Sequence, residues 1–323
     1  MKDVIYGPVS KDLQRVKSTL CEFSPAGITN FPDSEKMLGQ ILGGGKLLRP
    51  LLVLHAGNFY TYHPEKLLFM ATSAEMLHVA TLVHDDAIDR ADTRRGKPTI
   101  NSIWGSDKAI VLGDYLFASA AEFAAETESI RAVKLFAGAL ASISTGELRQ
   151  SFSAYNMTQE YAQYLKRIIG KTASLFAMAT ETGAVLSDAP EESVQILKDY
   201  GMNLGIAFQI MDDVLDFTGT EEELGKPVAS DLLQGTVTLP SLKIIKYYPD
   251  DNPVTRLFEG IGSKEDNIAE AIRLVKDTPI LDECIQAALE YSQEACKNLD
   301  SLPDSPSKES LYALADSMVK RRN

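Results

Sequence analysis

The stretch HDDAIDRADTRRGKPTIN, residues 84–101, places three carboxylates within about one turn of a predicted helix. Asp85 and Asp89 share a helix face, and Asp86 lies about 100° round the helix from Asp85. The preceding run LLFMATSAEMLHVATLVHDDAID has helical apolar spacing without glycine or proline, which predicts a helix over residues 65–89 that ends at the Arg-Arg-Gly-Lys-Pro segment. Acids at a helix C-terminus favour a bound cation, because the helix dipole is negative there. Mg²⁺ suits such a site, since it takes a few carboxylates completed by phosphates and water.

The same pattern occurs a second time, in GIAFQIMDDVLDFTGTEEELGKPVASDLLQGTVTLP at residues 205–240. Asp212, Asp213 and Asp216 again follow an apolar helix and precede a Gly-Lys-Pro loop. A single acidic triplet is common on a solvated helix face. Two copies in matching surroundings indicate a site, in which facing carboxylates would be bridged by two or three divalent ions.

Composition and charge exclude several classes of protein. The formal net charge of −13 argues against general nucleic-acid binding, which requires a basic face. The sequence contains no run of 18 or more apolar residues, so we expect no transmembrane helix. The N-terminus lacks the apolar core of a secretory signal. The three cysteines, Cys21, Cys284 and Cys296, are far apart and odd in number. They fit a reducing cytoplasm and argue against a disulfide framework or a zinc site, so we expect a cytoplasmic protein.

Two basic residues lie at the start of a predicted helix. In GGGKLLRPLLVLHAG, residues 43–57, three glycines end one helix and Pro50 suits the first turn of the next. Lys46 and Arg49 straddle this joint, where the helix N-terminus is a natural place for a phosphate. The alternative is a loop with two solvated basic side chains.

Two further residues have both a functional and a structural interpretation. His78 lies two turns before Asp85 on the same side of the helix, although a lone histidine on an apolar helix is commonly a satisfied core residue. Gly170-Lys171-Thr172 interrupts another predicted helix. A buried lysine there would need an anionic partner, whereas a solvated lysine would need none.

The pattern of the whole chain predicts an all-α fold. Residues 99–189 contain no proline and carry Ala, Leu, Glu and Phe at three- and four-residue spacing, which indicates several stacked helices. We find no tandem repeat and no useful β-alternation. The prediction is a single helical-bundle domain over residues 1–323, in which the two acid triplets face each other across a central cavity.

The motifs that are missing narrow the chemistry. No Ser-His-Asp or Cys-His constellation is evident, no glycine-rich dinucleotide loop follows a strand, and GxxxxGK[ST] is absent. A carboxylate and metal site flanked by basic residues would bind a diphosphate. Positioning and electrostatics at such a site can ionise a carbon–oxygen bond to a stabilised carbocation.

On these motifs the chain resembles the trans-polyprenyl diphosphate synthases over about residues 40–240. The motifs occur in the family's order: GGKLLRP at 44–50, His78, DDAID with RRG, GKT at 170–172, and FQIMDDVLD with GKP. Within the family, GDYLFA at 113–118 and DFTGTEEELGKPVASDLLQGTVTLP at 216–240 are similar to the large catalytic subunit (component II) of heptaprenyl and hexaprenyl diphosphate synthases.

The resemblance implies a role for each matched residue. The implied Mg²⁺ ligands are Asp85, Asp89 and Asp212, with Asp86, Asp213 and Asp216 as further ligands or close neighbours. The implied contacts to the allylic diphosphate are Arg94, Lys171, Thr172, Gln209 and Lys226, and those to isopentenyl diphosphate are Lys46, Arg49, His78 and Arg95. The catalytic groups would be Asp85, Asp89, Lys171 and Asp212. Two positions depart from the family: Leu47 stands where an arginine is frequent, and Thr236 where a lysine is frequent.

The implied reaction ionises the allylic substrate, attaches isopentenyl diphosphate through its double bond, and releases a proton to give a trans product. In the family, a bulky aromatic residue four or five positions before the first aspartate stops elongation early. Thr81 and Ala80 hold those positions here, and Leu77 and Met76 lie about two turns back. We therefore expect a product of about C30–C40, made from farnesyl diphosphate, since one isoprene unit is about as long as one helical turn.

Several alternatives remain open at this point. The chain could need a small regulatory subunit, or act as a self-sufficient homodimer that makes geranylgeranyl or octaprenyl diphosphate. Membrane contact would be at most peripheral, for product release, and the product could serve a quinone side chain or another lipid. A terpene cyclase would share the helical fold, but it normally replaces the second triplet with an Asn/Ser/Glu motif. A non-catalytic subunit would not need all six aspartates.

Overall fold

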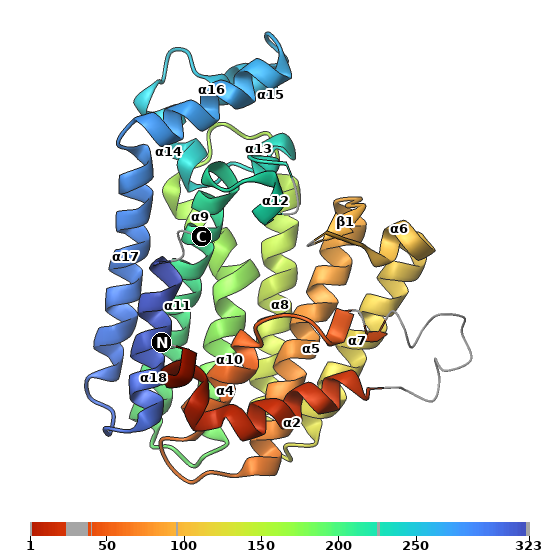
Figure 1. The fold of residues 1–323 in the computed structure, drawn as a ribbon, viewed down its shortest axis with the longest axis vertical. Helices are drawn as coiled ribbons and strands as arrows, with labels where there is room; N and C mark the ends of the chain where they lie inside the picture. The colour runs from red at the N-terminus through yellow and green to blue at the C-terminus, as the bar shows by residue number, and fades with distance from the viewer. Residues whose placement is uncertain (1, 24–37, 40, 95, 225–226, 321–323) are drawn as a thin grey trace. The chain divides into compact units, whose positions relative to one another are not determined.

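The computed structural model describes residues 2–23, 38–39, 41–94, 96–224 and 227–320. The described chain is mainly helical with almost no strands, which confirms the all-α prediction (Figure 1). The helices are α1 (Lys2–Tyr6), α2 (Ser10–Cys21), α4 (Leu48–Gly57), α5 (Pro64–Ile88), α6 (Ile100–Trp104), α7 (Ser106–Ala125), α8 (Ile130–Phe152), α9 (Tyr161–Ile168), α10 (Ser174–Val185), α11 (Glu191–Thr218), α12 (Glu221–Leu224), α13 (Ser230–Leu233), α14 (Leu239–Tyr247), α15 (Pro253–Glu259), α16 (Lys264–Asp277), α17 (Ile280–Leu299) and α18 (Pro306–Val319). A 3₁₀ turn, η1 (Gly7–Val9), and a π-helical segment, η2 (Ile169–Ala173), complete the helical elements.

Strands are confined, within the described ranges, to one short hairpin. β1 (Thr93–Arg94) pairs antiparallel with β2 (Lys97–Pro98), so that Arg94 is opposite Lys97. This hairpin occupies the segment that the sequence predicted as the end of the long helix.

The chain divides into two compact units, each assembled from three separate stretches. The first unit comprises Met1–Leu140, Leu175–Gly201 and Asn298–Leu314; the second comprises Ala141–Ser174, Met202–Lys297 and Ala315–Asn323. The interpretation of residues 1–323 as one domain around a central cavity stays a prediction.

The first unit is built around α5. This helix packs against α7, α4 and α2, and the hydroxyl of Ser73 in α5 donates to the carbonyl of Ala120 in α7 at 2.7 Å (Figure 1). By length and composition α5 could cross a membrane, and it is the one helix of the described chain that could. However, 72% of its most apolar window is buried inside the protein, as expected for a core helix.

The second unit has its own apolar core. Side chains of α9, α11, α14, α16 and α17 form this core, and its fully buried members include Tyr164, Phe217, Ile244, Val275 and Cys284. Burial raises the pKa of the Cys284 thiol to about 12, so this cysteine is held as an uncharged core residue.

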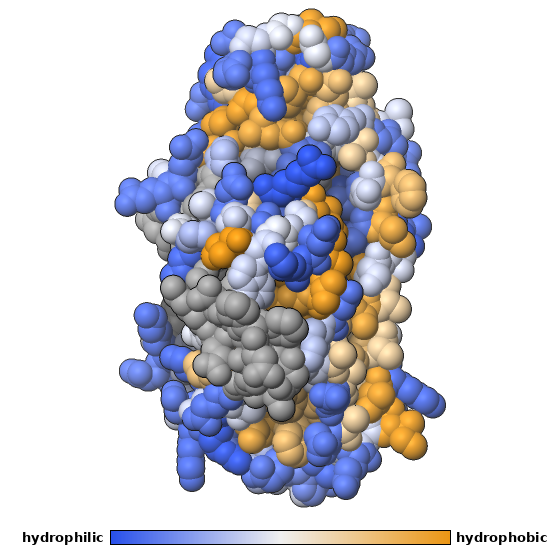
Figure 2. All heavy atoms as spheres, turned by 90° about the vertical axis from the view of Figure 1, so that its right-hand side faces the viewer, coloured by the Kyte–Doolittle hydropathy of each residue, from blue (hydrophilic) through white to orange (hydrophobic). Residues whose placement is uncertain are grey.

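Large apolar side chains also reach the surface. Ile103, Ile110 and Val111 of α6 and α7 are 50%, 43% and 66% exposed. Figure 2 shows apolar side chains interspersed with hydrophilic ones on the face that it draws. Ile110 and Val111 are adjacent on α7, so they form a small exposed apolar area of the first unit.

A buried histidine ties the two ends of the first unit together. The ring of His55 in α4 bonds the hydroxyl of Ser307 through Nδ1 at 3.1 Å and the carbonyl of Ile5 through Nε2 at 2.8 Å. The hydroxyl of Ser310 donates to the carbonyl of Val4 at 2.7 Å. Helices α1, α4 and α18 are therefore joined by polar contacts inside an apolar environment.

We expect His55 to make the stability of the protein pH-dependent. Burial lowers the pKa of His55 from 6.5 to about 4, so between these values the unfolded chain binds a proton that the folded chain does not. Stability from this group is therefore complete above pH 6.5 and is lost as the pH falls toward 4, by roughly 3 kcal/mol in all. In thermal unfolding, the stability of His55→Gln relative to the wild type should increase as the pH falls from 7 to 5. A scan at pH 8 measures the cost of the substitution itself, and a difference that does not change with pH would contradict the assignment.

Candidate functional site

The first acid triplet lies where α5 ends. The helix ends at Ile88, one residue before the predicted end at residue 89, and Asp89 is its C-cap. Arg90 then adopts a left-handed φ of 53°, and the amide of Ala91 donates to the carbonyl of Asp86 at 3.0 Å. This bond closes a Schellman-type turn, which stops the helix immediately after its carboxylates.

Within this triplet the acids have different surroundings. Asp86 is 7% exposed, and both of its oxygens accept the Nε–H of Arg94, at 2.8 and 3.0 Å. Burial raises the pKa of Asp86, and the charge of Arg94 opposes this rise. Asp85 is half-buried and Asp89 is exposed. Arg94, predicted to hold a diphosphate, is thus oriented by the middle acid of the motif.

His84, beside the triplet, docks α5 onto α7. Its Nε2 lies 2.9 Å from the carbonyl of Ile110 and 3.4 Å from Oδ1 of Asp114, and its ring meets Phe117 edge-on at 5.0 Å. A Cβ at Gly113 would lie 2.2 Å from Nε2 of His84. His84 had no predicted role, and in the sequence only the glycine of GDYLFA hints at this close packing.

In the second triplet, on α11, only the first acid is exposed. Asp212 is exposed, whereas Asp213 and Asp216 are each 2% exposed. Asp216 accepts the hydroxyl of Ser230 at 2.9 Å and the backbone N–H of Asp231 at 3.2 Å, which anchors the short helix α13. Asp216 thus holds the chain that follows the motif.

Asp213 accepts a hydrogen bond on each oxygen. Tyr164 of α9 donates its hydroxyl to Oδ2 at 2.7 Å, and Gln209 donates its amide to Oδ1 at 2.9 Å. Burial, with a smaller contribution from the charge of Asp231, raises the pKa of Asp213 to about 7, and the two hydrogen bonds oppose this rise. Tyr164 was not among the predicted site residues, because a tyrosine 49 positions away carries no local signal.

The Gly-Lys-Thr motif lies in the π-helical segment η2, which confirms that it interrupts a regular helix. Such segments are frequent at functional sites. Lys171 pairs with Glu147 of α8 at 2.7 Å, and Thr172 donates its hydroxyl to Gln209 at 2.6 Å. The segment crosses α8 closely, since a Cβ at Gly146 would lie 2.7 Å from the backbone nitrogen of Lys171.

The predicted isopentenyl contacts belong to the first unit. Helix α4 begins at Leu48, so Pro50 lies in its first turn as predicted, after Leu47 with a left-handed φ of 50°. Arg49 is therefore inside the first turn, 8% exposed, with its guanidinium 5.1 Å from the ring centroid of Phe176, while Lys46 is exposed. His78 is half-buried on α5.

The remaining predicted residues divide into two groups. Arg95 and Lys226 lie outside the described residues, so their predicted roles stay predictions. The chain-length positions are on α5, where Met76, Leu77 and Ala80 are fully buried and Thr81 is half-buried.

The donor chemistry of the triplets fits Mg²⁺. In the part of the chain that the structure describes, no three His, Cys, Asp or Glu side chains gather as a ready-made metal cage. Mg²⁺ does not require one, because proteins commonly hold it through one or two carboxylates together with substrate phosphates and water. The more accessible acids, Asp85, Asp89 and Asp212, present such oxygens.

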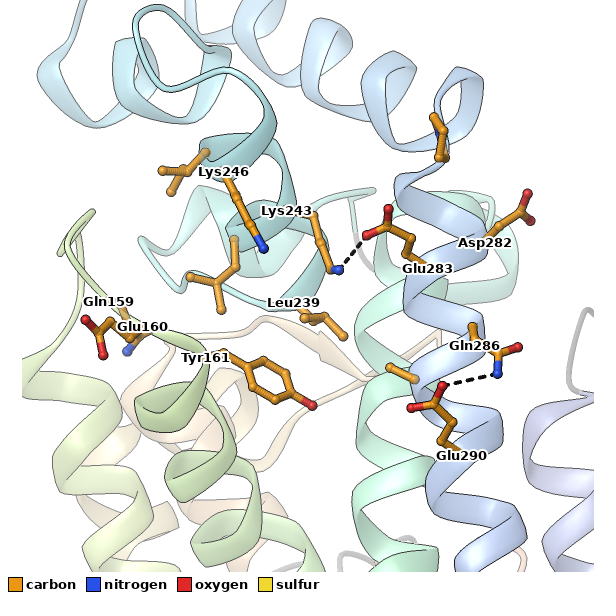
Figure 3. Close-up of a pocket in the computed structure, with 14 residues that line it drawn as sticks. Gln159, Glu160, Tyr161, Leu239, Lys243, Lys246, Asp282, Glu283, Gln286 and Glu290 are labelled. Atoms are coloured by element: carbon orange, nitrogen blue, oxygen red, sulfur yellow. Dashed lines mark hydrogen bonds and ion pairs between the residues drawn. The ribbon is translucent and has the colours of Figure 1, made fainter.

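A cavity of about 940 Å³ in the second unit lies apart from these residues (Figure 3). Tyr161, Lys243, Lys246, Glu283 and Glu290 are among the residues of α9, α14 and α17 that line it, and Lys243 pairs with Glu283. None of the predicted site residues lines this cavity, so it is not the predicted central cavity.

Comparison with known proteins decides the family. Residues 32–275 match the family model described as Polyprenyl synthetase. The chain belongs to this family. It is 39% identical to heptaprenyl diphosphate synthase component 2 of Geobacillus stearothermophilus over 324 residues, which cover 98% of each chain.

Solved structures agree with the sequence comparison. A polyprenyl synthase from Caulobacter crescentus, complexed with calcium and isoprenyl diphosphate, superposes with a TM-score of 0.91 at 32% identity and covers 99% of this chain and 98% of its own. Heptaprenyl diphosphate synthase from Staphylococcus aureus superposes with a TM-score of 0.88 at 34% identity, covering 99% of both chains. The protein is a prenyltransferase with the all-α fold of the isoprenyl diphosphate synthases.

The close crossing of α8 and η2 gives a direct test of the site geometry. Gly146→Ala should push the Gly-Lys-Thr segment away, lowering stability by about 1–3 kcal/mol and prenyl-transfer kcat/KM by about 10- to 100-fold. Gly138→Ala on the same helix is the matched control, because its Cβ meets nothing within 4 Å. Gly138→Ala should raise the free energy of unfolding by about 0.4–1 kcal/mol and keep full activity. Equal behaviour of the two variants in thermal unfolding and turnover would contradict this geometry.

Proposed function

We propose that this chain condenses isopentenyl diphosphate onto an allylic diphosphate, farnesyl diphosphate, to make an all-trans polyprenyl diphosphate of about C30–C40. The observation that carries the proposal is the repeated placement of carboxylates at the ends of α5 and α11. Each triplet has a more exposed acid and a buried acid that is bonded to the protein. The Geobacillus relative is named a heptaprenyl diphosphate synthase, which supports a polyprenyl product of this length.

Asp85, Asp89 and Asp212 are the residues that would hold Mg²⁺ in this proposal. Bound Mg²⁺ supplies positive charge to the leaving diphosphate, which favours ionisation of the allylic carbon–oxygen bond. Asp86, Asp213 and Asp216 instead position the chain around them, since each already accepts hydrogen bonds from neighbouring residues.

The basic groups would orient the allylic diphosphate. Asp86 fixes the Nε side of the Arg94 guanidinium, which leaves its other N–H groups to face an anion. Glu147 holds the Lys171 ammonium, and an ammonium carries three donors, so a phosphate oxygen can share it. Thr172, Gln209 and Lys226 would complete the allylic contacts, and Lys46, Arg49, His78 and Arg95 would bind the isopentenyl diphosphate.

With both substrates held, the chemistry needs little more from the protein. The allylic carbon–oxygen bond breaks and its electron pair leaves with the diphosphate. The double bond of isopentenyl diphosphate attacks the cation, and loss of a proton restores a trans double bond. Repetition lengthens the chain by five carbons each time.

The direct experiment is to incubate the purified chain with Mg²⁺, farnesyl diphosphate and labelled isopentenyl diphosphate, and to size the product by chromatography. We expect Mg²⁺-dependent incorporation into a product of about C30–C40. Conversion of farnesyl diphosphate to a hydrocarbon without incorporation of label would instead indicate a terpene cyclase. No incorporation, either alone or with a small regulatory subunit, would contradict the proposal.

A partner subunit is the second part of the proposal. The component 2 designation of the Geobacillus relative supports a heteromer, and exposed Ile110 and Val111 on α7 give the first unit an apolar surface for it. The alternative is a homodimer over the same surface. Incorporation by the purified chain alone, at a rate unchanged by a small subunit, would favour the homodimer.

Helix α5 provides the test of product length. Ala80 lies five residues before Asp85, roughly 7.5 Å along the helix, and is fully buried. Ala80→Phe should shorten the product to about C20, because a phenyl ring there would occupy the path of the growing tail; the shift is read by reversed-phase chromatography. Ala74→Phe, at another fully buried alanine of the same helix, controls for overpacking. An unchanged product length in Ala80→Phe would contradict the tunnel assignment.

A further inference from the structure

A chain of hydrogen bonds in the second unit joins three helical segments through one buried carboxylate. The hydroxyl of Tyr164 donates to Oδ2 of Asp213 at 2.7 Å, and the amide of Gln209 donates to Oδ1 at 2.9 Å. The Gln209 carbonyl accepts the hydroxyl of Thr172 at 2.6 Å. This series of hydrogen bonds therefore links α9, α11 and η2.

Because its members are buried, this series of hydrogen bonds is sensitive to the loss of any one side chain. Tyr164 is fully buried and Asp213 is 2% exposed, so water does not readily replace a missing donor. The amide of Gln209 turns an N–H toward Asp213 and its carbonyl toward Thr172, so both of its ends are held by hydrogen bonds. The amide nitrogen has a second hydrogen, and Gln209 thus keeps one donor for a ligand.

Arg167 holds the Tyr164 ring in place. Its guanidinium carbon lies 5.5 Å from the ring centroid, and it donates to the carbonyl of Val237 at 2.8 Å and to Oε1 of Gln159 at 3.1 Å. Because Arg167 is only 4% exposed and bonded on two sides, the ring beneath it has one orientation. The hydroxyl therefore points at Asp213 through rigid packing.

We propose that Tyr164 is a positioning residue for the allylic diphosphate: through Asp213 it fixes the side chains of Gln209 and Thr172 in the orientation that receives this substrate. The inference rests on the proposed function, which gives Gln209 and Thr172 to the allylic site. Tyr164 itself touches no substrate. Its effect is specific to one substrate, because the isopentenyl contacts lie on other elements.

The test is Tyr164→Phe, which removes one hydroxyl and keeps the ring beneath Arg167. We expect the KM for farnesyl diphosphate to rise about tenfold, which is the scale of one hydrogen bond to a charged group. The kcat should stay within about threefold and the KM for isopentenyl diphosphate should not change, since the lost interaction affects binding of one substrate. Calorimetric binding of farnesyl thiolodiphosphate, an unreactive analogue, should weaken by the same factor.

Tyr161→Phe is the matched control. Tyr161 is on the same helix, and its ring stacks on Tyr164 at 6.0 Å between centroids, but it faces the cavity of Figure 3. Its kinetic constants should equal those of the wild type. In addition, Tyr164→Phe combined with Gln209→Ala should bind the analogue no more weakly than Gln209→Ala alone, because both act through one chain of bonds.

Three results would overturn the proposal. They are an unchanged KM for farnesyl diphosphate, an equal rise of both KM values with a lowered thermal midpoint, and additive losses in the double variant. If Tyr164→Phe does not fold, Asp213→Asn replaces it, and the same difference between the two KM values is expected. Absence of prenyl transfer by the wild type contradicts the proposed function, whereas wild-type turnover with an unaffected Tyr164→Phe contradicts this inference alone.

Discussion

Repulsion between neighbouring carboxylates determines how the protein surrounds each of its two acidic motifs. Each triplet brings three negative charges to a helix, and the first triplet brings them to a C-terminus whose dipole is already negative. The protein offsets part of this cost with its own donors. Arg94 donates to Asp86 in the first triplet. Tyr164 and Gln209 donate to Asp213 in the second triplet.

Adjacent positions on a helix make this division possible. Consecutive residues point about 100° apart, so Asp212 can face solvent while Asp213 faces the core of the second unit. The same geometry separates Asp85 from Asp86. A motif of two consecutive aspartates therefore presents one accessible carboxylate, which we propose binds a cation, and one buried carboxylate that anchors its helix.

Much of the fold could be predicted from local sequence pattern. The spacing of apolar residues gave α5 almost to the residue, 65–89 against Pro64–Ile88, because a long periodic segment between clear stop signals has few alternatives. The interruption at Gly170-Lys171-Thr172 was also predicted. The joint at Pro50 was predicted too, because Pro50 lies in the first turn of α4. The left-handed conformation of Leu47 was not predicted, because its identity does not suggest it.

The anchoring of the site could not be predicted in this way. Tyr164 and Asp213 are 49 positions apart, and the close packing of His84 on Gly113 joins two helices. Such pairs are determined by tertiary packing, and periodicity shows only that each residue is on a buried face. The burial of Asp213 and Asp216 likewise depends on their partners, although the sequence presents them as equals of Asp212.

We propose that the more exposed acids of each motif bind Mg²⁺ while the buried acid holds the helix. Calorimetric titration of Mg²⁺ in the presence of inorganic diphosphate tests it most directly, with the wild type, Asp212→Asn and Asp213→Asn compared at the same pH. We expect that Asp212→Asn lowers the number of Mg²⁺ ions bound per chain and that Asp213→Asn leaves this number unchanged, even if affinity falls. An equal loss of bound ions in both variants, or an unchanged number in Asp212→Asn, would contradict it.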